Sequence, residues 1–300
     1  MQRKVIQLAG KTLVVSLPNK WVKQFGIQKG DELDILEEDN QLVIRSGKPK
    51  KQEKIVVDLS NLGMMARRTL GASYKAGYNE VEVFFDEPDK LEIINKETLQ
   101  FIGFEVMEQS NTRCLIKEIS SNHELEFENV LRMIFRSINE IGIDTVEALK
   151  DHNLKKLENI SMRDKVINRY TDFCRRNLNK FGYPDKNKSF VVYHVCEELE
   201  KISDCYKDLC KVVYKDDIVV SKKTRDLLQN INETIKLLQM AYYDYKPEVL
   251  EKFGQLCEST KEKISKEIFN HIKEAKVYLI LFNMICLIFD VNGAIIVKSF

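Results

Sequence analysis

Residues 190–213 read Phe-Val-Val-Tyr-His-Val-Cys-Glu-Glu-Leu-Glu-Lys-Ile-Ser-Asp-Cys-Tyr-Lys-Asp-Leu-Cys-Lys-Val-Val. Apolar side chains recur there every three or four positions, as at Leu199, Ile202 and Tyr206. That spacing is typical of an amphipathic helix, because it places the apolar side chains on one face. The same periodicity runs from residue 123 to the C-terminus, so the largest part of the chain is predicted to be all helical.

Short breaks divide this helical part. Proline occurs in it only at Pro184 and Pro247, and each of these positions favours a helix boundary. Two sets of three helices predict two antiparallel three-helix bundles, over about residues 121–217 and 218–300. The expected helices are 124–157, 161–181, 188–214, 221–245, 248–270 and 272–299.

Oxygen-bearing side chains form a second series on two of these helices. They stand four residues apart, so each series stacks along one flank of its helix. An all-oxygen set suits a hard or borderline cation and lacks the His or Cys that would hold zinc tightly. The sequence predicts a divalent or iron-type metal ion in the first bundle; the alternative is a solvated acidic face. The two series are Asp164, Asn168 and Asp172, and Glu200, Asp204 and Asp208.

Composition excludes several classes of protein. The chain has 47 Lys and Arg against 46 Asp and Glu, a net charge of +1, so the chain as a whole is no polycation. Its seven cysteines are scattered without a Cys-x-x-Cys pair, which favours reduced thiols in a cytoplasm over disulfides or a zinc site. The four histidines show no ligand spacing and support no nucleophile, so no enzymatic activity is expected.

No membrane segment is expected. The first 30 residues carry six Lys and Arg and no long apolar run, which argues against a signal peptide. The most apolar stretch, residues 277–289, is 13 residues long. Because a bilayer span needs ~20 residues, we expect a buried bundle helix, with membrane docking as the alternative. The predicted location is cytoplasmic.

The first 47 residues form a small β unit in the sequence pattern. Strands are expected at 4–8 and 12–17, a short helix at 19–25 between Pro18 and Gly26, and a hairpin of strands 32–36 and 41–45. A unit of this size buries little apolar surface, so a partner chain is expected.

Charge in this unit is unevenly distributed. Residues 1–30 carry six basic residues and no acid, whereas the acids begin at Asp31. A basic face on a dimerising unit favours contact with a phosphate backbone. The alternative is a strand edge that lysines protect from pairing.

Several spaced motifs here resemble the SpoVT/AbrB swapped-hairpin family. They are Val5-x-x-Leu8-x-Gly-Lys11, Leu13-Val-Val-Ser-Leu-Pro-x-x-Trp21-Val-Lys23 and Phe25-Gly-Ile-Gln-Lys-Gly-Asp31, followed by the hairpin. The resemblance covers residues 1–47 and implies an intertwined homodimer that binds DNA. Lysine lacks the fork with which arginine reads guanine, so we expect a modest, shape-based sequence preference. The implied DNA-binding residues are Arg3, Lys4, Lys11, Lys20 and Lys23.

A polar linker with Gly47 and Pro49 separates this unit from a middle domain over residues 48–120. Strands are expected at 54–59, 80–85, 104–108 and 113–119, with helices at 62–77 and 90–101. The alternation predicts a small α/β domain. No Gly-rich phosphate loop follows any of these strands, so this domain is interpreted as a spacer or regulatory module.

The helical part, residues 121–300, resembles the PhoU family. Glu200-Lys-Ile-Ser-Asp204-Cys-Tyr-Lys-Asp208 matches the acidic motif of that family, and Asp164-Lys-Val-Ile-Asn168 matches it with Asn in place of Asp. The second bundle departs further, since Cys286 stands where the motif has an acid before Asp290. An AbrB-like domain ahead of a PhoU-like one recurs in archaeal proteins. The resemblance implies a role in phosphate homeostasis.

Together these patterns predict a multidomain α+β protein. Its expected function is that of a DNA-binding transcriptional regulator of phosphate uptake, with the PhoU-like part as metal-binding sensor or partner-docking element. The alternative is an adaptor that does not bind DNA and docks on a phosphate ABC transporter or a signalling protein. A di-iron enzyme is disfavoured because the chain has no Glu-x-x-His pair.

Overall fold

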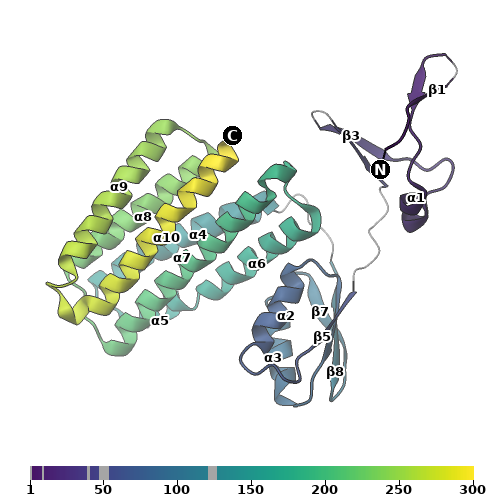
Figure 1. Cartoon of the computed structure of the whole chain (residues 1–300). Coiled ribbons are helices and arrows are strands. Elements are labelled where there is room, and N and C mark those ends of the chain that lie inside the picture. The colour runs from purple at the N-terminus through teal and green to yellow at the C-terminus, as the bar shows by residue number, and fades with distance from the viewer. Residues whose placement is uncertain (1, 9, 39–40, 47–53, 121–126) are drawn as a thin grey trace. The chain divides into compact units, whose positions relative to one another are not determined.

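The computed structural model describes residues 2–8, 10–38, 41–46, 54–120 and 127–300. The chain forms two compact units, Met1–Glu53 and Lys54–Phe300. Most of the predicted linker and the first residues of the predicted helix 124–157 lie outside the described residues. Figure 1 shows the elements of both units, and each unit is described by itself below.

The first unit has the predicted order of elements. Its strands pair as two separate antiparallel sheets, β1 with β2 and β3 with β4. Gly26 ends the short helix in the left-handed conformation, with φ 57°, which glycine adopts without strain. The elements are β1 (Ile6–Leu8), β2 (Thr12–Val14), α1 (Asn19–Phe25), β3 (Asp34–Glu38) and β4 (Gln41–Arg45).

The second unit begins with the predicted α/β domain. Strand β5 runs parallel to β6, and β8 lies antiparallel between β6 and β7, so the sheet order is β5-β6-β8-β7. Helices α2 and α3 cover one face of this sheet and enclose a core that includes Leu70, Tyr74 and Ile94. The elements are β5 (Lys54–Asp58), α2 (Ala66–Lys75), β6 (Glu80–Phe84), α3 (Asp89–Thr98), β7 (Phe104–Gln109) and β8 (Arg113–Glu118).

The rest of the second unit is helical. Five of the six predicted helices appear with their ends shifted by a few residues, and α10 follows a short 3-10 turn, Ile272–Glu274. The helices are α4 (Phe127–Lys150), α5 (Leu154–Ser161), α6 (Asp164–Phe181), α7 (Ser189–Asp216), α8 (Lys222–Tyr243), α9 (Pro247–Glu267) and α10 (Ala275–Ser299).

The prediction of one helix over 124–157 is wrong. Helix α4 ends at Lys150, and His152 takes the left-handed conformation with φ 47°. The side chain of Asn153 then accepts a hydrogen bond from Lys156 N at 2.9 Å and caps α5. An Asn side chain that satisfies a free N–H at a helix start competes with continuation of the preceding helix, so the chain turns here.

The described helices do not form two independent bundles. Their buried residues make one continuous core, from Phe127 to Ile295. Helix α10 packs against α8 and α9, and it packs most extensively against α7, beside which it runs in Figure 1. The prediction had assigned α7 and α10 to different bundles. Because α10 is apolar on most of its circumference, it buries surface against three neighbours rather than along one stripe.

The predicted apolar run 277–289 lies in α10, and its inward side chains are buried, among them Leu281 and Ile288. Among the described residues, the segment Ile272–Ser299 is the one helix long and apolar enough to cross a membrane, and 33% of its apolar window is buried inside the protein. Its outward side exposes Leu279 and Phe289.

Arg176 of α6 joins the helical part to the α/β domain. It is 1% exposed, lies over the ring of Phe104 at 4.5 Å, and donates a hydrogen bond to Tyr74 O at 2.8 Å. Its guanidinium also forms an ion pair of 3.3 Å with Glu118. Lys180 forms a second ion pair with the same carboxylate, at 2.7 Å. This buried contact fixes α6 against the sheet domain.

Candidate nucleic-acid interface

Helix α1 presents two of the predicted DNA-binding residues. Lys20 and Lys23 are exposed and stand three positions apart, so they share one face of the helix. Trp21 and Phe25 are half-buried, and their ring centroids lie 5.7 Å apart. The aromatic pair packs within the unit, and the two ammonium groups remain in solvent.

The other three predicted residues lie around the first hairpin. Arg3 and Lys4 precede β1, and Lys11 lies in the turn between β1 and β2. Gln7 closes this turn, because its side-chain amide donates a hydrogen bond of 2.7 Å to Gly10 O.

All five basic side chains are exposed. Arginine and lysine that are not already paired can neutralise phosphates and release the counterions of DNA. The assignment of these five residues to DNA contact stays a prediction. Within the part of the chain that the structure describes, Arg3, Lys4, Lys11, Lys20 and Lys23 form no ion pair with a carboxylate.

The first unit also exposes its apolar side chains. Among its residues whose side chains are described, none is buried. Val5 is 65% exposed, Leu13 68% and Leu42 63%. Apolar surface gathered at this density on so small a unit marks an interaction surface. A second chain that covers these side chains would give the unit the core that it lacks.

The predicted metal ligands lie on α6 and α7, where cations partner them. Asp164 is buried and accepts hydrogen bonds of 3.1 Å from Ser203 Oγ, Asn168 Nδ2 and Lys207 Nζ. Lys207 also pairs with Asp204. Asp208, one turn further along α7, is exposed.

Arg175 lies between the carboxylates of Asp172 and Glu200. It is 5% exposed, donates to Asp172 at 2.6 Å and pairs with Glu200. Lys75 of α2 reaches Asp172 at 3.2 Å. Burial raises the pKa of the Glu200 carboxyl above its ordinary value, while Arg175 opposes that rise. Cations from α2, α6 and α7 therefore pair with four carboxylates of this acidic flank, those of Asp164, Asp172, Glu200 and Asp204.

Within the described residues, no group of three or more His, Cys, Asp or Glu side chains comes close enough to hold a metal ion. The six predicted ligands are thus placed on facing helices as expected but are not brought together as one ligand set, and the metal stays a prediction. The four-residue spacing of the acids did not reveal their basic partners. Arg175 and Lys207 stand three positions after Asp172 and Asp204, and this spacing is the signal for ion pairs on one helix.

Comparison with known proteins bears on the first unit alone. Residues 6–54 match the family model of the MazE antitoxin, described as antidote-toxin recognition MazE, bacterial antitoxin. The chain matches no curated protein and no solved structure. MazE/AbrB-like domains bind DNA and typically dimerise. The match, the order of the strands and helix, and the exposed apolar side chains agree. The first unit is therefore similar to MazE/AbrB-like domains, and this similarity supports an N-terminal AbrB-like DNA-binding domain.

Proposed function

We propose that the chain is a dimeric transcriptional regulator that binds DNA through its first unit and controls phosphate uptake. The observation that carries the DNA-binding part is a set of five exposed basic residues on an AbrB-like domain, none of which pairs with a carboxylate of the described residues. Two copies of that domain would present two basic faces to one duplex. Since lysines predominate, binding would depend mainly on phosphate contacts and on the shape of the duplex.

The role in phosphate homeostasis rests on a resemblance, the Glu200-x-x-x-Asp204 motif on α7. In this proposal the second unit acts as the sensor or docks on a partner, such as a phosphate transporter or a signalling protein. Docking requires no metal, which agrees with carboxylates that already have cationic partners. The proposed role is regulatory and not enzymatic.

The test is an anisotropy titration of full-length protein on labelled duplex from its own upstream region and on a scrambled duplex, at several salt concentrations. We expect the affinity to fall steeply with salt. In Lys20→Ala/Lys23→Ala the salt slope should decrease by about 1 for each phosphate that the variant no longer neutralises.

The matched control is Arg136→Ala/Lys266→Ala, which removes two exposed cations of the second unit that pair with Glu140 and Glu262. It should leave DNA binding unchanged. If wild-type protein fails to bind at low salt, or if the Lys20/Lys23 double variant binds as the wild type does, the DNA-binding proposal is wrong.

A second candidate follows from the printed description of the matched family, which names recognition of a toxin. In this reading the first unit dimerises and the chain holds another protein as an adaptor. The same titration separates the two functions, since an adaptor would show no salt-dependent binding to either duplex.

A further inference from the structure

A cleft lies within the second unit, between the α/β domain and α6, and it borders the acidic flank at Asn168 and Asp172. Two adjoining cavities form it, of about 440 and about 410 Å³, and they share Leu99 and Arg169. Each falls within the range of sites that hold small organic molecules, roughly 300–1,000 Å³. The buried Arg176–Glu118 contact holds the two walls together.

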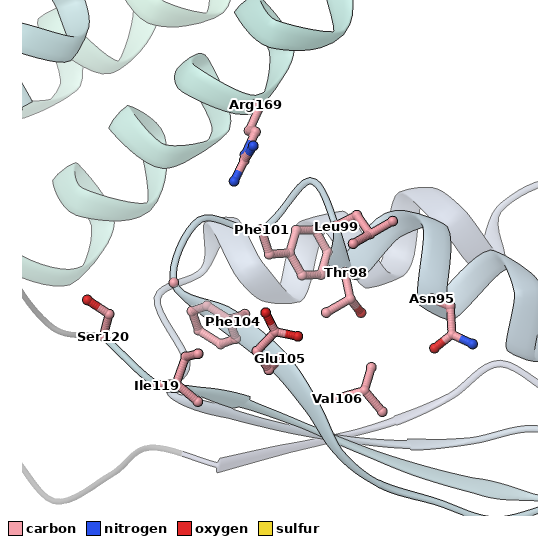
Figure 2. Close-up of a pocket in the computed structure, with 11 residues that line it drawn as sticks. Asn95, Thr98, Leu99, Phe101, Phe104, Glu105, Val106, Ile119, Ser120 and Arg169 are labelled. Atoms are coloured by element: carbon pink, nitrogen blue, oxygen red, sulfur yellow. The ribbon is translucent and has the colours of Figure 1, made fainter.

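The wall on the α/β domain is apolar. Figure 2 shows the apolar side chains that line it, among them Leu99, Val106 and Ile119 and the rings of Phe101 and Phe104. Leu99 is 71% exposed and Ile119 60%, although both lie beside a cavity. The position of Ile119 is fixed, because its N–H donates a hydrogen bond of 2.8 Å to Gly103 O. This wall offers an exposed apolar surface to a ring.

The opposite wall is cationic. Arg169 of α6 reaches toward the apolar surface, as Figure 2 shows, and Lys165 lies one turn before it. Of the described residues, none forms an ion pair with Lys165 or Arg169. Both cations are therefore available to an anion that enters the cleft.

The carboxylates around the cleft leave this positive charge in excess. In the second cavity Glu97 accepts from Arg67 at 2.7 Å, and Asp172 accepts from Arg175. The first cavity is lined by a single further carboxylate, that of Glu105. One carboxylate against the two cations of α6 leaves the cleft with a net positive charge.

One hydrogen-bond acceptor in the cleft is also unsatisfied. Asn168 lines the second cavity, and its amide nitrogen donates to Asp164, which leaves Oδ1 buried without a donor. A buried acceptor without a partner is unfavourable unless a ligand or water supplies a donor. A ligand for this cleft thus needs an anion, a flat apolar ring and a hydrogen-bond donor.

We propose that the cleft between α3 and α6 binds a small organic phosphate of the nucleoside monophosphate kind. Its ring lies against Leu99 and Ile119, its phosphate meets Arg169 and Lys165, and a hydroxyl or amino group donates to Asn168 Oδ1. The ligand would bridge the α/β domain and the helical part. The site shares Asn168 and Asp172 with the predicted metal ligands, but the proposal requires neither a metal nor DNA.

The experiment is isothermal titration calorimetry on full-length protein with three probes: adenosine monophosphate, adenosine and inorganic phosphate. We expect adenosine monophosphate to bind, and each of its two halves to bind at least roughly tenfold more weakly. Arg169→Ala should weaken the binding of adenosine monophosphate roughly tenfold, since alanine cannot donate charge-assisted hydrogen bonds to the phosphate. Arg136→Ala, which removes an exposed arginine of α4, should leave it unchanged.

Leu99→Glu tests the apolar wall, because it sets a carboxylate beside the ring and near the phosphate. It should reduce binding as much as Arg169→Ala does, with an unchanged circular dichroism spectrum. The proposal is overturned if adenosine monophosphate does not bind, or if it binds equally to both variants and the wild type. It is also overturned if Leu99→Glu only lowers self-association in light scattering, which would assign this face to contact between copies.

Discussion

The two units form helices and strands from the same local sequence signals, but they differ in how far their side chains are buried. Both show strand alternation, and most of their helices form within a few residues of where the sequence predicts them. Yet the first unit has no buried residue among those whose side chains are described, whereas the second encloses two cores. Leu13 of β2 is 68% exposed; Phe135 of α4 is fully buried.

The difference teaches that secondary structure and stability come from different sources here. Helices and hairpins form where local signals favour them, but the net stability of a domain comes largely from apolar burial. The second unit buries enough apolar surface within one chain to be stable by itself. The first unit does not, so we expect its stability to depend on a partner chain.

The largest expected effect tests the core of the second unit. Phe135 packs against Tyr242 and Tyr243, with ring centroids 5.6 and 5.9 Å away. Phe135→Ala would leave a cavity, so we expect the free energy of unfolding to fall by about 3–5 kcal/mol. Urea denaturation followed by circular dichroism measures it. Phe190→Ala, at a position 86% exposed, is the matched control and should change it by less than about 0.5 kcal/mol. Equal losses in the two variants would contradict the assigned core.

A second prediction tests whether the first unit is half of an interface. In a single chain Leu13→Asp should be nearly neutral, because that side chain is already in water. In a dimer that covers Leu13 it would bury a charge, at a cost of about 2–3 kcal/mol, which is roughly a hundredfold weaker association. Light scattering should then show the mass of one chain.

The control for this variant is Phe269→Asp, at a position 83% exposed in the second unit. It should leave the dimer intact. The thermal unfolding of the second unit should be the same in both variants. A dimer that persists in Leu13→Asp would show that these exposed side chains do not form the interface.

The fold was predictable where local chemistry decides it. Apolar periodicity located α6 to α10, and Pro18 and Gly26 located α1. Two features needed knowledge of tertiary packing. The break at His152 depends on whether Asn153 caps a new helix or stays inside the old one, and the apolar pattern alone favours continuation. The choice of α7 as the main neighbour of α10 was not predictable, because a helix that is apolar on most sides fits several partners.

The candidate sites also differ in whether a local sequence signal could locate them. Charge asymmetry located the basic residues of the first unit, since that signal is local. The acidic flank of α6 and α7 was predicted as a ligand set, but Lys75 reaches Asp172 from α2, a distant part of the sequence. The cleft beside Leu99 and Arg169 had no sequence signal, because its two walls come from segments that meet only in the folded chain.

The smallest expected effect concerns Glu200, where burial and ion pairing compete. Its pKa is raised above the ordinary 4.5, chiefly by burial. The folded state then binds more protons than the unfolded state between the two pKa values, so the free energy of unfolding falls as the pH rises from about 4.5 through the folded pKa. Glu200→Gln cannot titrate at this position, and Asp172 still pairs with Arg175 in that variant. The free energy of unfolding of Glu200→Gln should therefore fall less than that of the wild type as the pH rises through this window. The difference should stay below about 1 kcal/mol. Urea denaturation across the window measures it, with Glu262→Gln as the variant that removes an exposed carboxylate. If the stability of the wild type relative to Glu200→Gln instead rises with pH, Arg175 outweighs burial and the carboxylate is held charged in the folded state.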